Sequence, residues 1–194
     1  MSKTSLHTFI AYVEDRPGVL NRMTSLLRRR NYNIVSLTVG RTEREGVSRM
    51  TIVLEADDDA ARRIEANLYK LVNVLRIEDA TAASTVVREL ALIKVRADAA
   101  ARGEVMRLCD VFRARVVDVG PEALVAEITG AAEKIEGLVD VLRPFGILEM
   151  VRTGAVAMLR SAEAVVPTRD PLAPEPGDPG PGDPEPGDDD AKAA

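Results

Sequence analysis

The feature that most constrains the fold of this chain is the order of its hydrophobic patterns, which read strand, helix, strand, strand, helix, strand and then repeat. In residues 6–81 the first strand, LHTFIAYVE, precedes a helix whose apolar positions are spaced to share one face: Val19, Leu20, Met23, Leu26 and Leu27. Two β-rich runs, NIVSLTVGR and VSRMTIVLE, are joined by a polar stretch that suits a hairpin. A second helix with Ala61, Ile64, Leu68 and Leu71 in register leads to a closing strand, NVLRIEDAT.

The same order of elements returns in residues 86–160. RELALIKVRA predicts a strand, GEVMRLCDVFRA a helix, and RVVDVGPEALVAEITG two strands about a Gly-Pro turn. AAEKIEGLVDVLRPFG predicts the second helix and ILEMVRTGAVAML one last strand. The two copies share the order of their elements, but the sequence identity between them is low. An α+β fold of two tandem βαββαβ modules follows, each a four-stranded antiparallel sheet with two helices on one face, the ferredoxin-like arrangement.

The second face of the first sheet has no predicted helix to cover it. The strand LHTFIAYVE is apolar on both sides, with Phe9, Ala11 and Val13 alternating against Ile10 and Tyr12. A sheet with two apolar faces needs a second packing partner. We therefore expect modules or subunits to pair over this face.

Charge is unevenly distributed along the chain. Of the formal net charge of −5, residues 161–194 carry nine acidic against two basic residues, so the body is close to neutral. This segment repeats Pro, Gly and Asp and predicts a disordered tail. The near-neutral body predicts no binding to nucleic acid or membrane. Without a long apolar run or a secretory signal pattern, we expect a cytoplasmic protein.

The residues that usually carry chemistry are scarce. His7 is the sole histidine, Cys109 is the sole cysteine and falls on an apolar helical stripe, and neither a metal-binding cluster nor a glycine-rich phosphate loop occurs. RNA-recognition modules share the topology but stack bases on aromatic residues of the central strands; this chain has only three Phe and three Tyr, and VSRMTIVL contains no aromatic residue. We interpret Arg28 to Arg30 as the solvent-exposed face of a helix. We predict no catalytic and no metal-binding residues.

One turn has the composition of a binding site. The first strand ends at Glu14 and Asp15, turns through Pro17 and Gly18, and opens directly into a helix. Unpaired amides at a helix N-terminus, together with the helix dipole, suit a carboxylate, and glycine allows a ligand to approach the backbone. Pro17 fits the first turn of the helix. An ordinary capped turn without a ligand explains the same residues, so both interpretations stay open here.

Several motifs then occur in a specific order. The turn D-R-P-G-V-L resembles the ligand loop of ACT domains. The string NYNIVSLTV followed by SRMTI, then LYKLVNVL, RELALIKV and a closing RTG, is similar to the acetolactate synthase small subunit family over about residues 6–160. Asn31 stands where that family usually has glycine, and asparagine tolerates the same left-handed turn.

The resemblance implies a site for valine at the interface of two N-terminal ACT domains. The implied effector-binding residues are Asp15, Arg16, Pro17, Gly18, Val19 and Leu20 from one subunit, and Asn33 with Ile34 from the facing subunit. Asp15 replaces an asparagine found in some members. Its carboxylate could contact the ammonium group of the ligand or cap the helix.

The resemblance also implies a function. The chain is expected to be a non-catalytic subunit that forms a homodimer through its ACT domains, activates the large catalytic subunit and confers feedback inhibition by valine. Thiamine diphosphate, magnesium and FAD are expected in the large subunit and none of them in this chain. The alternatives are a tandem ACT sensor that regulates another enzyme or a transcription factor, and an adaptor that binds no ligand.

Overall fold

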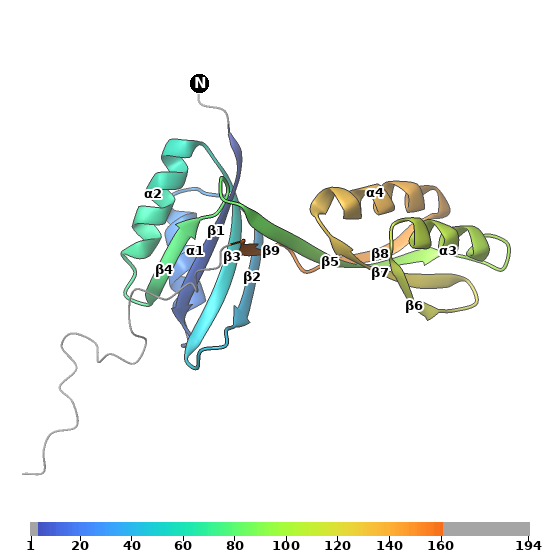
Figure 1. The fold of residues 1–194 in the computed structure, drawn as a ribbon, viewed down its shortest axis with the longest axis horizontal. Coiled ribbons are helices and arrows are strands. Elements are labelled where there is room, and N and C mark those ends of the chain that lie inside the picture. The colour runs from blue at the N-terminus through green and yellow to red at the C-terminus, as the bar shows by residue number, and fades with distance from the viewer. Residues whose placement is uncertain (1–3, 161–194) are drawn as a thin grey trace, which may run out of the picture.

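A computed structural model describes residues 4–160, which form two antiparallel sheets with two helices on each (Figure 1). The first module contains β1 (Ser5–Glu14), α1 (Val19–Arg29), β2 (Ile34–Arg41), β3 (Val47–Ala56), α2 (Asp58–Tyr69) and β4 (Val74–Asp79). The second contains β5 (Thr85–Arg96), α3 (Arg102–Val111), β6 (Arg115–Val119), β7 (Ala123–Gly130), α4 (Ala132–Leu142), the 3₁₀ turn η1 (Arg143–Phe145) and β8 (Ile147–Arg152). A last strand, β9 (Val156–Leu159), follows. The predicted pair of ferredoxin-like modules is confirmed.

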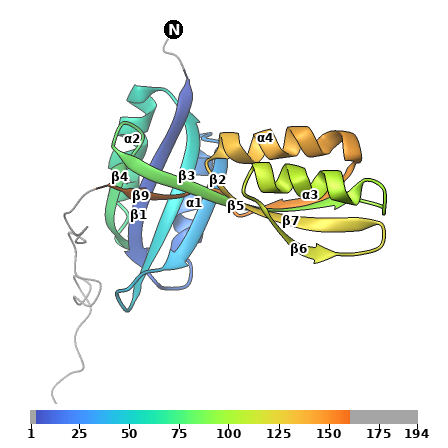
Figure 2. The same ribbon diagram turned by 45° about the vertical axis from the view of Figure 1, so that its right-hand side comes forward.

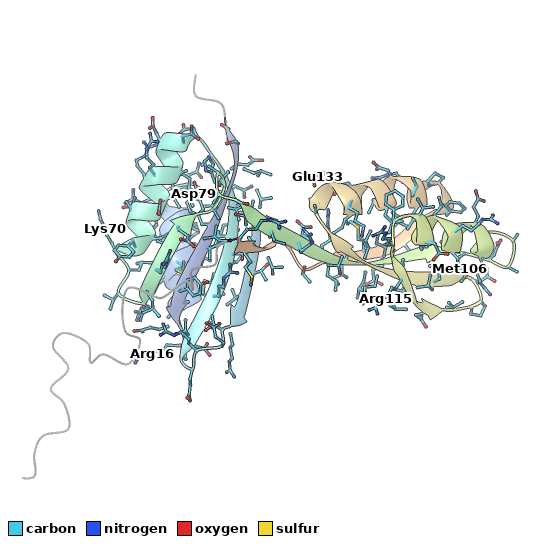
Figure 3. All side chains as sticks on the ribbon, viewed as in Figure 1. Arg16, Lys70, Asp79, Met106, Arg115 and Glu133 are labelled. Carbon is cyan, nitrogen blue, oxygen red and sulfur yellow. The ribbon has the colours of Figure 1, made fainter. Side chains whose placement is uncertain are left out.

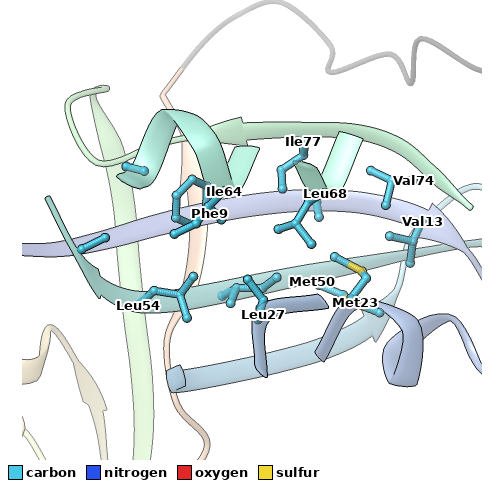
Figure 4. Close-up of a cluster of buried hydrophobic side chains, with 14 of the residues drawn as sticks. Phe9, Val13, Met23, Leu27, Met50, Leu54, Ile64, Leu68, Val74 and Ile77 are labelled. Carbon is cyan, nitrogen blue, oxygen red and sulfur yellow. The ribbon is translucent and has the colours of Figure 1, made fainter. Parts of the chain in front are cut away.

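The first sheet has the strand order β2-β3-β1-β4, and α1 and α2 cover one of its faces. The core between helices and sheet is built from alternate strand residues, as the predicted two-residue period requires (Figure 4). Its fully buried side chains include Phe9, Met23, Leu27, Ile52, Leu54, Ile64 and Leu68. The carboxylate of Asp57 caps α2 by accepting the amide hydrogen of Ala60 at 2.7 Å.

The second sheet repeats the arrangement with the strand order β6-β7-β5-β8. Its core holds Ile135, Leu138, Val139 and Leu142 of α4, all of which were predicted to share a buried face. Cys109 is also buried there, and burial raises the pKa of its thiol. The pattern of α3 and α4 therefore predicted the packing of this module correctly.

The prediction of one last strand over residues 147–159 is wrong. The chain leaves β8 at Arg152, breaks at Gly154, which has a φ of +81°, and resumes as β9. β9 pairs antiparallel with the first half of β5, Thr85–Arg88, while the second half of β5 is a central strand of the second sheet. β5 therefore runs continuously through two sheets and links the modules (Figure 1).

The two-stranded ribbon of β9 and the start of β5 packs on the face of the first sheet that no helix covers (Figure 2). Ile10 and Ala157 are buried at this contact, and Tyr12, Val87 and Leu159 pack around them. Thr51 points to the same face and is only 2% exposed. The expected partner for this face is therefore supplied in part by the chain itself.

The corresponding face of the second sheet is more open. Leu92 and Val151, with 38% and 57% exposure, line a shallow hollow there of about 210 Å³. The acidic segment 161–194, for which the sequence predicts disorder, lies outside the described residues. Within residues 4–160, no helix has the length and hydropathy needed to span a membrane.

Candidate effector site

The predicted ligand turn lies at one end of the first module, where β1 passes into α1. Figure 3 places Arg16 at this end and Asp79 toward the opposite end of the same sheet. The helix begins at Val19 with Gly18 as its N-cap, so Pro17 lies before the helix rather than in its first turn as predicted. The side chain of Val19 is buried in the core. Leu20, predicted to share that buried face, is 42% exposed because it lies about 100° further around the helix.

Gly18 gives the turn its shape and leaves it open. Its φ of +86° is a left-handed conformation that residues with a Cβ adopt only at a cost. A Cβ built on Gly18 would meet no atom within 4 Å, so the space beside the turn is free. No side chain caps α1. The Val19 amide donates to the Arg16 carbonyl at 3.4 Å, and the hydrogen bonds of the described residues include none from the Leu20 and Asn21 amides.

The equivalent turn of the second module differs. Between β5 and α3, the carboxylate of Asp98 accepts the amide hydrogens of Ala100 and Ala101 at 3.0 and 2.9 Å. The guanidinium of Arg102 donates to the carbonyls of Gly120 and Pro121 and ties this turn to the β6–β7 turn. The amides of this turn are thus satisfied internally, whereas no described hydrogen bond uses the Leu20 and Asn21 amides of α1.

Asp15 does not cap α1, so that alternative is wrong. Its carboxylate accepts hydrogen bonds from Arg41 Nε and Ser48 Oγ, both at 3.1 Å, and its amide donates to the Gly46 carbonyl at 2.8 Å. These bonds turn the side chain toward the β2–β3 hairpin, beside a groove of about 530 Å³ lined by residues 41–47. A contact between Asp15 and a ligand ammonium stays a prediction.

A buried polar network beneath the turn was missed by the sequence reasoning. Glu14 is 8% exposed and accepts a hydrogen bond from Asn73 Nδ2 at 2.6 Å. The Asn73 side-chain carbonyl accepts from Arg22 of α1, and the Glu14 amide donates to the Asn73 carbonyl at 3.0 Å. This network fixes the end of β1 against the first turns of α1. The only sequence signal was an acidic residue, Glu14, at the end of an apolar strand.

The remaining predicted residues lie at the other end of α1. Asn33 and Ile34 border a groove of about 560 Å³ on the outer side of this helix, lined by Asn21, Thr24, Ser25, Arg28, Asn31 and Tyr32 as well. Ile34 packs partly into the core, while Asn33 is exposed. Asn31 has a φ of +59°, which confirms the predicted left-handed turn.

One chain does not bring the two groups of predicted residues together. The 11 residues of α1 separate Gly18 from Asn33 by roughly 16 Å, more than a small amino acid can bridge. A common site therefore needs Asn33 from a second copy. Within residues 4–160, no group of three or more His, Cys, Asp or Glu side chains is arranged to hold a metal ion.

Comparison with known proteins places this geometry in a family. Residues 9–76 match the family model described as an AHAS small subunit-like ACT domain, and residues 88–161 match the model for the small subunit of acetolactate synthase. The chain is 48% identical to the acetolactate synthase small subunit of Mycolicibacterium smegmatis, over 84% of this chain and 95% of that one. The chain belongs to the acetolactate synthase small subunit family.

Two further members of the acetolactate synthase small subunit family support the assignment. A probable acetolactate synthase small subunit of Archaeoglobus fulgidus is 47% identical over 79% of this chain and 96% of its own length. The crystal structure of the Thermotoga maritima small subunit matches with a TM-score of 0.76 at 38% identity, over 81% of this chain and 98% of that one. The resemblance read from the motifs, and the fold it implied, are confirmed.

Proposed function

We propose that this chain is the regulatory subunit of an acetolactate synthase, which binds the large catalytic subunit, raises its activity and inhibits it when valine is bound. The observation that carries this proposal is the uncapped N-terminus of α1 beside Gly18 in a family member with an ACT domain. In the second module, the turn before the equivalent helix is closed by Asp98, whose carboxylate accepts the amide hydrogens of Ala100 and Ala101. The Leu20 and Asn21 amides of α1, which no described hydrogen bond uses, are the groups that would bind a carboxylate.

The residues around the turn suit a small apolar amino acid. The ligand carboxylate would accept hydrogen bonds from the amides that follow Gly18. The exposed side chain of Leu20 would contact the ligand's aliphatic group. The carboxylate of Asp15, 37% exposed and already oriented by Arg41 and Ser48, would attract the ammonium group. Asn33 of a second copy would complete the site, which makes binding dependent on the dimer.

The large subunit would carry the thiamine diphosphate, magnesium and FAD of the complex. This chain would change the rate of the reaction by stabilising one arrangement of the assembly over another. Such coupling between a ligand and a distant site is typically 1 to 3 kcal/mol, or about 5- to 150-fold.

The test is reconstitution of the purified chain with a large acetolactate synthase subunit. We expect the complex to make acetolactate faster than the large subunit alone, valine to reduce that rate, and the isolated chain supplied with all cofactors to make none. Calorimetry on the isolated chain should show valine binding. Turnover by the rigorously purified chain, or a complex whose rate responds neither to this chain nor to valine, would refute the proposal.

A further inference from the structure

Residues 153–159, here called the strap, connect the two modules on the face opposite the helices. The strap follows β8 of the second module directly, yet its backbone is held by side chains of the first. The Ala155 amide donates to Ser36 Oγ at 2.9 Å, and Thr38 Oγ1 donates to the Thr153 carbonyl at 3.4 Å. The guanidinium of Arg49 donates to the Ala157 carbonyl and stacks over the Tyr12 ring at 5.7 Å. Strands β2 and β3 therefore hold the strap along its length.

The contact requires glycine at position 154 for two independent reasons. The φ of +81° disfavours any residue with a Cβ. A Cβ at this position would also lie 2.4 Å from Ser36 Oγ and 3.3 Å from Thr38 Oγ1. Ser36 cannot turn away freely, because its oxygen accepts the hydrogen bond from Ala155. The backbone of the strap at Gly154 thus lies so close to Ser36 of β2 that no side chain fits between them.

A β-bulge presents Ser36 to the strap. Ile34 pairs with Leu54 and Ser36 pairs with Val53, with a register shift between them at Val35. In a regular strand, residues two apart share a face, so Ser36 would point with Ile34 toward the helices. The bulge instead leaves Ile34 in the helix-side core and puts Ser36 on the strap side. The contact with Ala155 depends on this bulge.

The bulge lies next to the proposed effector site. Asn33 immediately precedes β2, and Ser36 lies three positions further along the chain, about 10 Å away in a strand. In the sheet that the structure describes, β2 is an edge strand hydrogen-bonded to β3 alone. Edge strands interrupted by bulges are among the more easily displaced parts of a sheet. A ligand that holds Asn33 therefore acts on the part of β2 whose conformation decides where Ser36 lies.

The other end of the strap is joined to the second module. The Thr153 amide donates to the Leu90 carbonyl at 3.0 Å, and Leu90 donates its amide hydrogen to Thr153 Oγ1 at 3.1 Å. Leu90 belongs to the half of β5 that lies in the second sheet. A displacement of the strap is consequently transmitted to the central strand of that sheet.

We propose that the strap transmits effector binding from the first module to the second, through the bulge at Val35 and the contact of Ser36 with Gly154 and Ala155. This inference rests on the proposed function, because it takes valine to bind with Asn33. The ligand stabilises one conformation of the bulge and thereby changes how tightly Ser36 holds the strap. The position of the second module against the first changes with it.

The experiment uses the full chain and compares Gly154→Ala with Gly146→Ala. Gly146 also has a positive φ, +93°, but the nearest atom to a Cβ there is Arg96 Cβ at 4.0 Å. The control thus shares the backbone strain without the contact with Ser36. Ser36→Ala is the second test variant, since it removes the acceptor for Ala155 without adding volume. Melting curves and calorimetry with valine establish folding and binding for each variant.

For the parent chain, we expect valine to change the hydrogen exchange of the strap amides at least threefold. For Gly154→Ala and Ser36→Ala, we expect valine affinity within about threefold of the parent but no exchange response of the strap. In the reconstituted complex, the factor by which saturating valine lowers activity should fall at least threefold, within the range of typical allosteric coupling. Gly146→Ala should match the parent in all three measurements.

The outcomes separate this inference from the proposed function. If valine binds the parent but leaves exchange of the strap unchanged, or if Gly154→Ala and Ser36→Ala remain as inhibited as the parent, the strap does not transmit binding. The proposed function stands in both cases. If calorimetry shows no valine binding by the parent and its complex is not inhibited, the proposed function itself is wrong.

Discussion

Replacing Gly18 by aspartate or by asparagine tests the proposed anion site directly. The two side chains have the same shape, and both are among the residues that best tolerate a positive φ. Since a Cβ at Gly18 meets no atom within 4 Å, neither variant should clash. Each should lose about 1 to 2 kcal/mol of folding free energy from the left-handed conformation, or roughly 3 to 6 °C in melting temperature.

The negative charge should make Gly18→Asp more stable than Gly18→Asn but a weaker binder of valine. A carboxylate at the N-terminus of α1 interacts favourably with the helix dipole, by about 0.3 to 1 kcal/mol, so Gly18→Asp should be the more stable variant. The same carboxylate would lie beside that of the ligand. Two like charges about 4 Å apart repel by roughly 1 kcal/mol in water and more near a protein surface. Gly18→Asp should therefore bind valine at least tenfold more weakly than Gly18→Asn, which corresponds to about 1.4 kcal/mol.

Calorimetric titration with valine and thermal unfolding at low ionic strength would measure both quantities. High salt should reduce the difference in binding, because the repulsion is partly screened. The reasoning fails if Gly18→Asp and Gly18→Asn bind valine equally well. Equal binding would mean that the ligand carboxylate does not lie at the amides of α1.

Three further outcomes are expected. Asn33→Ala should weaken valine binding by about 1 to 3 kcal/mol, since a hydrogen bond to a charged group is lost, while unchanged inhibition of the complex would place the site elsewhere. Deleting residues 161–194 should change the melting temperature by less than roughly 3 °C and leave activation intact, because the segment offers little apolar surface to bury; a larger loss would show that it packs or binds. Burial by itself would raise the pKa of Asp79, but hydrogen bonds from Thr81 and His7 outweigh this effect and hold the pKa below its usual value. Its contribution to stability is complete above about pH 4 and is lost as the pH falls through the lowered pKa. Denaturant unfolding of Asp79→Asn should accordingly show a smaller loss of stability below pH 4 than that of the parent, and parallel curves would refute this assignment.

Much of each module was determined by local sequence. The alternation of Phe9, Ala11 and Val13 with Ile10 and Tyr12 predicted a strand buried on both sides, and both sides are buried. The spacing of Ile135, Leu138 and Leu142 predicted the inner face of α4. Such patterns are readable because each residue's side of a helix or strand follows from its position along the element. The turn at Gly18 was readable for a related reason, since its residues are adjacent in sequence.

Tertiary structure decided where distant segments meet. The apolar residues of β8 and β9 have the same strand-like pattern, so the sequence alone did not separate the two strands. β9 pairs with the start of β5 and packs on the uncovered face of the first sheet, which only the tertiary structure brings together. The bulge at Val35 and the turning of Asp15 toward Arg41 depend on β3 and the β2–β3 hairpin. The separation of Gly18 from Asn33 follows from the length of α1, and it makes a second copy necessary for the proposed site. The pairing of β9, the bulge and the Asp15 contacts arise from long-range contacts, which exist only once segments distant in sequence have come together.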